Sequence, residues 1–101
     1  MGTRLELHDI LVDILGSDNV YFQPPPAHQM EYPAIVYERD YAVTQFADNS
    51  PYRYTKRYKI TIIDRDPDSL IPDKIAMLPL TTFDRHFVTT QLNHDIFNTY
   101  F

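Results

Sequence analysis

The clearest periodic pattern in the sequence is an alternation of apolar and polar residues over 52–64. Its even positions are large β-favouring residues, and its odd positions are polar, which is the period of a strand covered on one face. The even set is Tyr52, Tyr54, Tyr58, Ile60 and Ile62, and the odd set is Arg53, Thr55, Arg57, Lys59 and Thr61. Only Lys56 and Ile63 break the alternation. We therefore predict a long strand here.

A second alternating run, over 34–44, predicts the partner of this strand. Residues 47–51, Ala-Asp-Asn-Ser-Pro, have the composition of a turn, so the two strands would form an antiparallel hairpin. Their apolar faces coincide only if paired residue numbers add to an odd value. A sum of 97 sets Glu38 opposite Lys59 and Asp40 opposite Arg57. The basic residues of the later strand would then be partly neutralised inside the sheet.

Apolar residues at helical spacing predict two helices. In the first, over 3–15, Thr3 and Glu6 have the spacing of a capping box, and Gly16 follows as a left-handed terminator. Its apolar stripe is Leu7, Ile10, Leu11, Ile14 and Leu15. A second, shorter helix would begin with Asp68 as its cap and end before Pro79. Its stripe is Leu70, Ile71, Ile75 and Leu78.

The remaining segments complete a small single domain. Residues 20–22 suit a short strand, and the prolines at 24–26 favour a rigid connector over a polyproline ligand, because no PxxP repeat is present. Residues 83–90 and 96–101 suit two closing strands joined by a turn at 92–95. We expect one α+β domain over 1–101, with a mostly antiparallel sheet, a long hairpin and two packed helices.

Composition and charge narrow the classes of function. The chain carries eight tyrosines and six phenylalanines among 101 residues, and such side chains serve both sheets and interfaces. A net charge of −5 argues against broad nucleic-acid binding, although five of the nine basic residues fall between 53 and 65. The absence of cysteine excludes disulfides and thiolate metal sites. No apolar run approaches a membrane span, so we expect a protein made in the cytoplasm.

No motif indicates catalysis. Asp84 and His86 would share a face of a strand and His94 lies beyond the next turn, whereas a metal site needs three or four converging ligands. The carboxylates of 64–68 alternate, but an EF-hand would need glycine in place of Ser69 and glutamate in place of Ile75. With two glycines in the chain, a phosphate-cradling glycine loop is excluded. We expect neither an enzyme nor a cofactor.

Several segments, taken in order, carry a resemblance to a known family. They are Tyr-Pro-Ala-Ile-Val-Tyr at 32–37, residues 58–68 with Ile-Asp-Arg-Asp-Pro-Asp, Phe-Asp-Arg-His-Phe at 83–87 and Leu-Asn-His-Asp-Ile-Phe at 92–97. Together they resemble the tail-terminator, or tail-completion, proteins of long-tailed bacteriophages, or a neighbouring head-completion or connector protein. The resemblance implies an α+β fold and a virion protein, typically a hexameric ring, that caps the tail tube and joins it to the head.

A ring requires two different patches on each subunit, which meet around a closed rotation. The hairpin with its tip and the aromatic C-terminal residues are the candidates. Basic residues of the hairpin would form salt bridges between subunits or face the lumen, or else pair within their own sheet. The candidate interface residues are Glu38, Asp40, Phe46, Tyr52, Arg53, Arg57, Lys59, Phe97, Tyr100 and Phe101.

The resemblance also implies partners. These are the tail tube protein on one face of the ring and a head-completion or connector protein on the other, with DNA passing through the lumen without sequence-specific contacts. The alternative function is a monomeric adaptor that binds a peptide, for example by adding a strand to the sheet edge. A closed ring in solution would support the first function. A monomer at all concentrations would leave either an adaptor or a subunit that assembles only on the tail, and would favour the adaptor.

Overall fold

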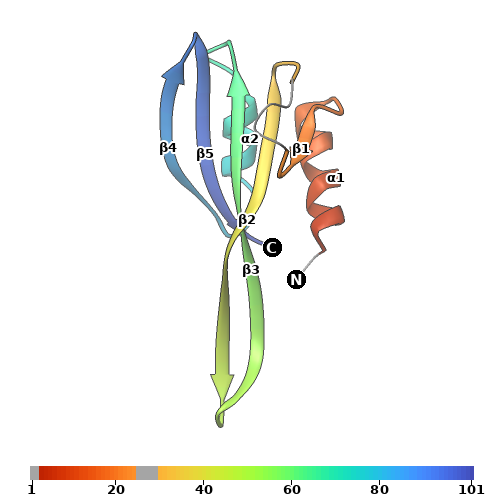
Figure 1. Ribbon diagram of the computed structural model, residues 1–101, viewed down its shortest axis with the longest axis vertical. Helices are drawn as coiled ribbons and strands as arrows, with labels where there is room; N and C mark the ends of the chain where they lie inside the picture. The colour runs from red at the N-terminus through yellow and green to blue at the C-terminus, as the bar shows by residue number, and fades with distance from the viewer. Residues whose placement is uncertain (1–2, 25–29) are drawn as a thin grey trace.

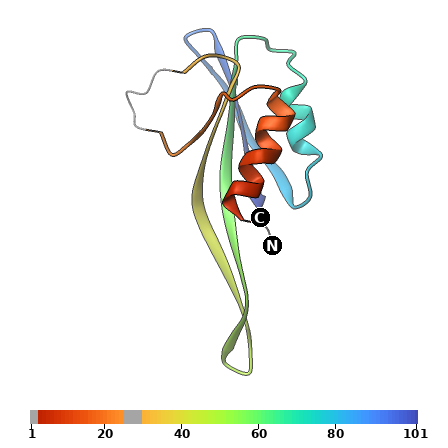
Figure 2. The ribbon, with the colours of Figure 1, turned by 90° about the vertical axis from the view of Figure 1, so that its right-hand side faces the viewer.

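The computed structural model describes residues 3–24 and 30–101, except for the side chains of 51–53. Five strands form one mixed sheet in the order β1-β2-β3-β5-β4, with β1 parallel to β2 and the other neighbours antiparallel. Both helices cover the same face of this sheet (Figure 2). The α+β prediction is confirmed. The elements are α1 (Arg4–Leu15), β1 (Val20–Phe22), β2 (Ala34–Ala47), β3 (Ser50–Asp64), α2 (Ile71–Ala76), β4 (Thr81–Thr89) and β5 (Leu92–Tyr100).

Helix α1 forms where its end signals predicted it. The Thr3 hydroxyl accepts a hydrogen bond from the Glu6 backbone amide at 3.2 Å, which satisfies one of the free amides of the first turn. At the other end, Gly16 has φ 80° and its amide donates to the Val12 carbonyl. The left-handed backbone at Gly16 ends the helix and turns the chain toward β1.

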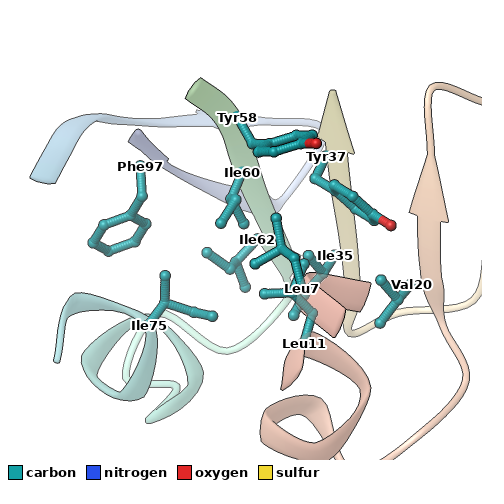
Figure 3. Close-up of a cluster of buried hydrophobic side chains, with 10 residues drawn as sticks. All are labelled: Leu7, Leu11, Val20, Ile35, Tyr37, Tyr58, Ile60, Ile62, Ile75 and Phe97. Atoms are coloured by element: carbon teal, nitrogen blue, oxygen red, sulfur yellow. The ribbon is translucent and has the colours of Figure 1, made fainter. Parts of the chain in front are cut away.

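The core lies between the helices and one face of the sheet (Figure 3). Leu7 and Leu11 of α1 and Ile75 of α2 enter it from the helical layer, and each is at most 1% exposed. The sheet supplies Val20, Ile35, Tyr37, Tyr58, Ile60, Ile62 and Phe97. The even positions of β3 from Tyr58 onward therefore face the helices, as the alternation predicted.

Tyr37 carries its hydroxyl into this core and keeps it hydrogen-bonded. The ring is fully buried, its oxygen lies 2.7 Å from His8 Nδ1, and the Arg4 guanidinium donates to it at 3.2 Å. Burial raises the pKa of the Tyr37 hydroxyl above its ordinary value, although the neighbouring Arg4 acts in the opposite direction. The contacts anchor the start of α1 to the first part of β2.

The predicted hairpin register is confirmed in the half that belongs to the sheet. Pairs from Ala34 with Ile63 to Arg39 with Tyr58 follow the sum of 97, and Glu38 lies opposite Lys59. Asp40 is then an extra residue in β2, so Tyr41 rather than Asp40 pairs with Arg57. This β-bulge shifts the register by one residue, and the apolar sets of the two strands no longer share a face beyond it.

Beyond the bulge, the hairpin leaves the sheet as a free ribbon, which we call the arm (residues 41–56). Strand β5 pairs with β3 only from Arg57 to Asp64, and β1 pairs with β2 only over 35–37. The arm accounts for the elongated shape of the molecule, whose extents are 51 × 24 × 23 Å (Figure 1). Its tip is a turn at Asp48 and Asn49, both with positive φ.

The structure corrects two predictions about turns and caps. Helix α2 begins after Leu70, with no side-chain cap, so Asp68 is not its cap. The carboxylates of Asp64 and Asp66 instead accept the backbone amides of Asp66 and Asp68, which forms two successive turns. These hydrogen bonds hold the aspartates in turns, so the helix begins later in the chain than predicted.

The turn between the closing strands was also placed wrongly. It lies at Thr90 and Gln91, with φ 52° and 62°, and residues 92–95 belong to β5. The prediction failed because neither turn residue is a glycine or asparagine, which usually mark such positions. The predicted rigid connector includes Pro25 and Pro26, which lie outside the described residues.

Replacing Gly16 with alanine should destabilise the protein by about 1 kcal/mol, because an L side chain is strained at positive φ. A Cβ at this position meets nothing within 4 Å, so the cost would come from the backbone alone. Urea unfolding of both proteins measures it. Gly16→Asn serves as the matched control and should lose less stability than Gly16→Ala, since asparagine tolerates this conformation. Equal losses for both variants would contradict the explanation.

Candidate functional site

Three aromatic residues stand out on the surface of the arm. Tyr41 is 55% exposed, Phe46 near the tip is 65% exposed, and Tyr54 is 53% exposed. A two-stranded ribbon is marginally stable alone, and large exposed aromatic rings are typical of interfaces. The arm therefore has the features of a segment that acquires further contacts from another molecule.

The bulge explains why these rings do not form one apolar side. After Asp40, Tyr41 shares a face with Arg57, whose guanidinium lies 4.9 Å from the centre of the Tyr41 ring. Tyr54 pairs with Thr44 and lies on the opposite face. Because aromatic rings occupy both faces, packing a single side of the arm against the body would leave some of them exposed.

Two basic residues near the arm's base, Arg57 and Lys59, are paired with acidic residues of the same hairpin. Arg57 Nε and one terminal nitrogen each donate to the Asp40 carboxylate at 3.1 Å, a bidentate geometry. The hydrogen bond with Asp40 raises the pKa of the Arg57 guanidinium. Lys59 and Glu38 lie 4.0 Å apart and are more exposed. These basic residues were expected either to form salt bridges between subunits or face the lumen, or to pair within their own sheet. The described geometry corresponds to pairing within the sheet.

Two hairpin residues of the candidate interface, Tyr52 and Arg53, have side chains outside the described set. The C-terminal candidates divide into two groups. Phe97 is 2% exposed and belongs to the core of its own chain, with an edge-to-face contact to Phe83 at 5.4 Å between ring centres. Tyr100 and Phe101 are half-buried. Phe101 is tied to the start of the arm, since its amide donates to the Lys56 carbonyl.

An apolar hollow of about 300 Å³ lies beside these C-terminal residues. It is bounded by Leu7 and Ile10 of α1, the segment after α2, and Thr99 to Phe101. Leu80 at its rim has positive φ and is 65% exposed. Sequence reasoning missed this surface, because its parts come from three separate elements.

Strand β4 is the second surface that sequence reasoning missed. It is the terminal strand of the sheet, and its backbone edge is unpaired on the outer side among the described strands. Phe83, Phe87 and Val88 on this strand are all more than 40% exposed. A long exposed edge can pair with another chain unless charges or a bulge interrupt it. Here Asp84 forms a bulge, and Arg85 beside it is charged.

The histidines and aspartates near β4 do not assemble into a metal site. His86 Nε2 lies 3.3 Å from the Asn93 side-chain oxygen, and His94 stacks on Phe87 with ring centres 4.5 Å apart. Asp84 pairs with its neighbour Arg85 at 3.6 Å. Within residues 3–24 and 30–101, no three potential ligands converge. The same part of the chain holds no helix long and apolar enough to cross a membrane.

A comparison with protein-family models finds no match to the chain, and a comparison with curated proteins finds none either.

Reversing one charge of the bidentate pair should loosen the arm. Arg57→Glu places two carboxylates side by side, so the backbone amides of the arm should exchange with solvent faster. The double variant Asp40→Arg/Arg57→Glu should recover much of the protection, because it restores opposite charges at the same positions. Amide exchange followed by NMR makes this measurement. Lys59→Glu is the control and should have a smaller effect, since its pair spans 4.0 Å. No recovery in the double variant would show that the pair does not act within the arm.

Asp95 gives a pH-dependent prediction. Burial raises the pKa of its carboxyl and Asp73 adds to this effect, while His86 and His94 oppose it. A raised pKa means that the folded protein binds the proton more tightly. The resulting stability is present at low pH and is lost as the pH rises through the carboxyl range. The free energy of unfolding of Asp95→Asn, compared with that of the wild type, should therefore be higher at pH 8 than at pH 3.

Urea unfolding at the two pH values measures the difference. Asp13→Asn, at an exposed position on α1, reports the general effect of removing one surface carboxylate. If both variants changed with pH to the same extent, the explanation from burial would be wrong.

Proposed function

We propose that this chain is a structural virion protein that assembles with copies of itself into a ring, closing the tail tube of a long-tailed bacteriophage and joining it to the head. The observation that carries the proposal is the arm, with exposed aromatic rings on both faces beyond the sheet. The ordered resemblance of residues 32–37, 58–68, 83–87 and 92–97 to tail-terminator proteins supports the phage setting.

A ring needs contacts between two different patches, and this subunit offers two unlike surfaces, the arm and the β4 edge. The arm continues β2 and β3, the second and third strands in the order, beyond the rest of the sheet, while the free edge of β4 lies at one end of the strand order. Contacts between unlike surfaces of successive copies close into a ring when the rotation permits. A homodimer joined by identical patches would use only one of these surfaces.

Partners follow from the same proposal. One face of the ring would bind the tail tube protein and the other a head-completion or connector protein. DNA would pass through the lumen without sequence-specific contacts, because a subunit with a net charge of −5 repels phosphates over most of its surface. The protein would be made in the host cytoplasm and reside in the neck of the virion.

The second candidate function is a monomeric adaptor that binds an extended peptide. The exposed outer edge of β4 supports it, since a peptide strand can add to a free sheet edge through backbone hydrogen bonds. In this function, the β4 edge rather than the arm carries the binding. Solution mass separates the candidates: six subunits of 11.9 kDa give about 71 kDa, and an adaptor stays near the mass of one.

Phe46→Ser should weaken self-association by about 30-fold, if the ring near the arm tip is an anchor worth about 2 kcal/mol. The fold should be unaffected within about 0.5 kcal/mol, because Phe46 is 65% exposed. Light scattering across a wide concentration range measures the association. The matched control is Met77→Ser, which removes an 84% exposed apolar side chain from the body.

If Phe46→Ser and Met77→Ser weakened self-association equally, the arm would have no special role in it. A strict monomer for the wild type, in the presence of tail tubes as well as in dilute solution, would favour the adaptor.

A further inference from the structure

A second hollow, of about 450 Å³, lies where the arm joins the body. Unlike the apolar hollow near the C-terminus, it is lined mainly by donors of hydrogen bonds. Its lining residues are Arg4, Phe22, Gln23, Arg39, Lys56 and Tyr58. They come from α1, the end of β1 and the two strands of the hairpin, so the fold brings together three cations that are distant in sequence.

The hairpin geometry places two of these cations on the side that faces α1. Arg39 pairs directly with Tyr58, and paired residues of antiparallel strands project to the same face. Lys56 lies two positions from Tyr58 on β3 and therefore shares that face. Tyr58 itself is 3% exposed and forms the floor beside them.

None of the three cations is neutralised within the part of the chain that the structure describes. The ion pairs found there are Arg57 with Asp40, Lys59 with Glu38 and Arg85 with Asp84. Arg4, Arg39 and Lys56 take part in none of them. Three unpaired cations around one hollow are unusual in a protein with a net charge of −5, because like charges repel and acidic side chains are plentiful.

Two of the polar groups are held in place before any ligand arrives. The Arg4 guanidinium donates to the buried Tyr37 hydroxyl at 3.2 Å and lies 4.4 Å from the centre of the Phe22 ring. Gln23 has a left-handed backbone with φ 45°. Its side-chain oxygen accepts the Arg39 amide at 3.3 Å, which leaves its amide nitrogen as a donor. Such fixed donors reduce the ordering cost of binding.

We propose that this hollow binds a phosphate group. Two guanidinium groups, one ammonium group and one carboxamide nitrogen supply donors only, so the complementary ligand is an oxyanion with several acceptor oxygens. A tetrahedral phosphate presents its oxygens in several directions toward three surrounding cations, whereas a carboxylate presents two oxygens in one plane. The phosphate belongs either to a small phosphorylated compound or to a nucleic-acid backbone. The inference does not depend on ring formation.

Inorganic phosphate is the probe that tests the site. Titration at low ionic strength, followed by calorimetry and by NMR of the arginine Nε–H groups, should show saturable binding that chloride at equal ionic strength does not reproduce. Arg39→Gln and Lys56→Gln should each weaken binding about tenfold or more, because each removes a charge-assisted hydrogen bond. Both positions are at the surface, and thermal unfolding without phosphate checks that the variants fold.

Arg85→Gln is the matched control, since it removes the same charge from β4, far from the hollow in the strand order. Absence of saturable phosphate binding would overturn the proposal, and so would equal weakening by Arg85→Gln. A short DNA duplex then identifies the source of the phosphate. Displacement of phosphate by the duplex would indicate a nucleic-acid backbone, and its failure to displace phosphate would indicate a small compound. Solution mass is measured separately, so either result leaves the ring proposal to its own test.

Discussion

The two-helix cover on one face of the sheet is the constraint on which the rest of the molecule depends. Helices α1 and α2 bury the inner face of β2, β3 and β5, where Ile60 and Ile62 are fully buried. The helices are short, and the cover ends near Tyr58. Strands β2 and β3 nevertheless continue for several residues, because their backbone hydrogen bonds need no core. The arm is therefore the part of one hairpin for which the described residues, 3–24 and 30–101, supply no covering layer.

Sequence reasoning succeeded where the determinants are local. Thr3 and Gly16 end α1 through contacts with residues a few positions away, and the alternation of 34–64 specifies the register as far as Arg39. It failed at Thr90 and Gln91, which form a turn without the usual turn residues. The bulge at Asp40 likewise has no glycine to mark it, although the predicted contact of Asp40 with Arg57 survives as a side-chain pair.

The candidate surfaces were predicted less completely, because periodicity identifies a face of a strand and not what covers it. Tyr54 and Tyr58 belong to the same alternating set, yet one is 53% exposed and the other 3% exposed. Phe97 was grouped with the interface candidates and lies in the core. The basic hollow combines Arg4 with Arg39 and Lys56, and only the folded arrangement of α1 against the hairpin brings them together.

The bulge at Asp40 also has a mechanical consequence. At about 3.3 Å per residue, the strand from Tyr41 to Ala47 is a lever roughly 23 Å long, so a bend of about 10° at its base would move the tip by about 4 Å. An extra residue is where such a ribbon bends most easily, since the ladder of hydrogen bonds is interrupted there. The Asp40–Arg57 pair crosses this point and acts as a brace. One ion pair at the surface thus opposes bending of the ribbon at its base.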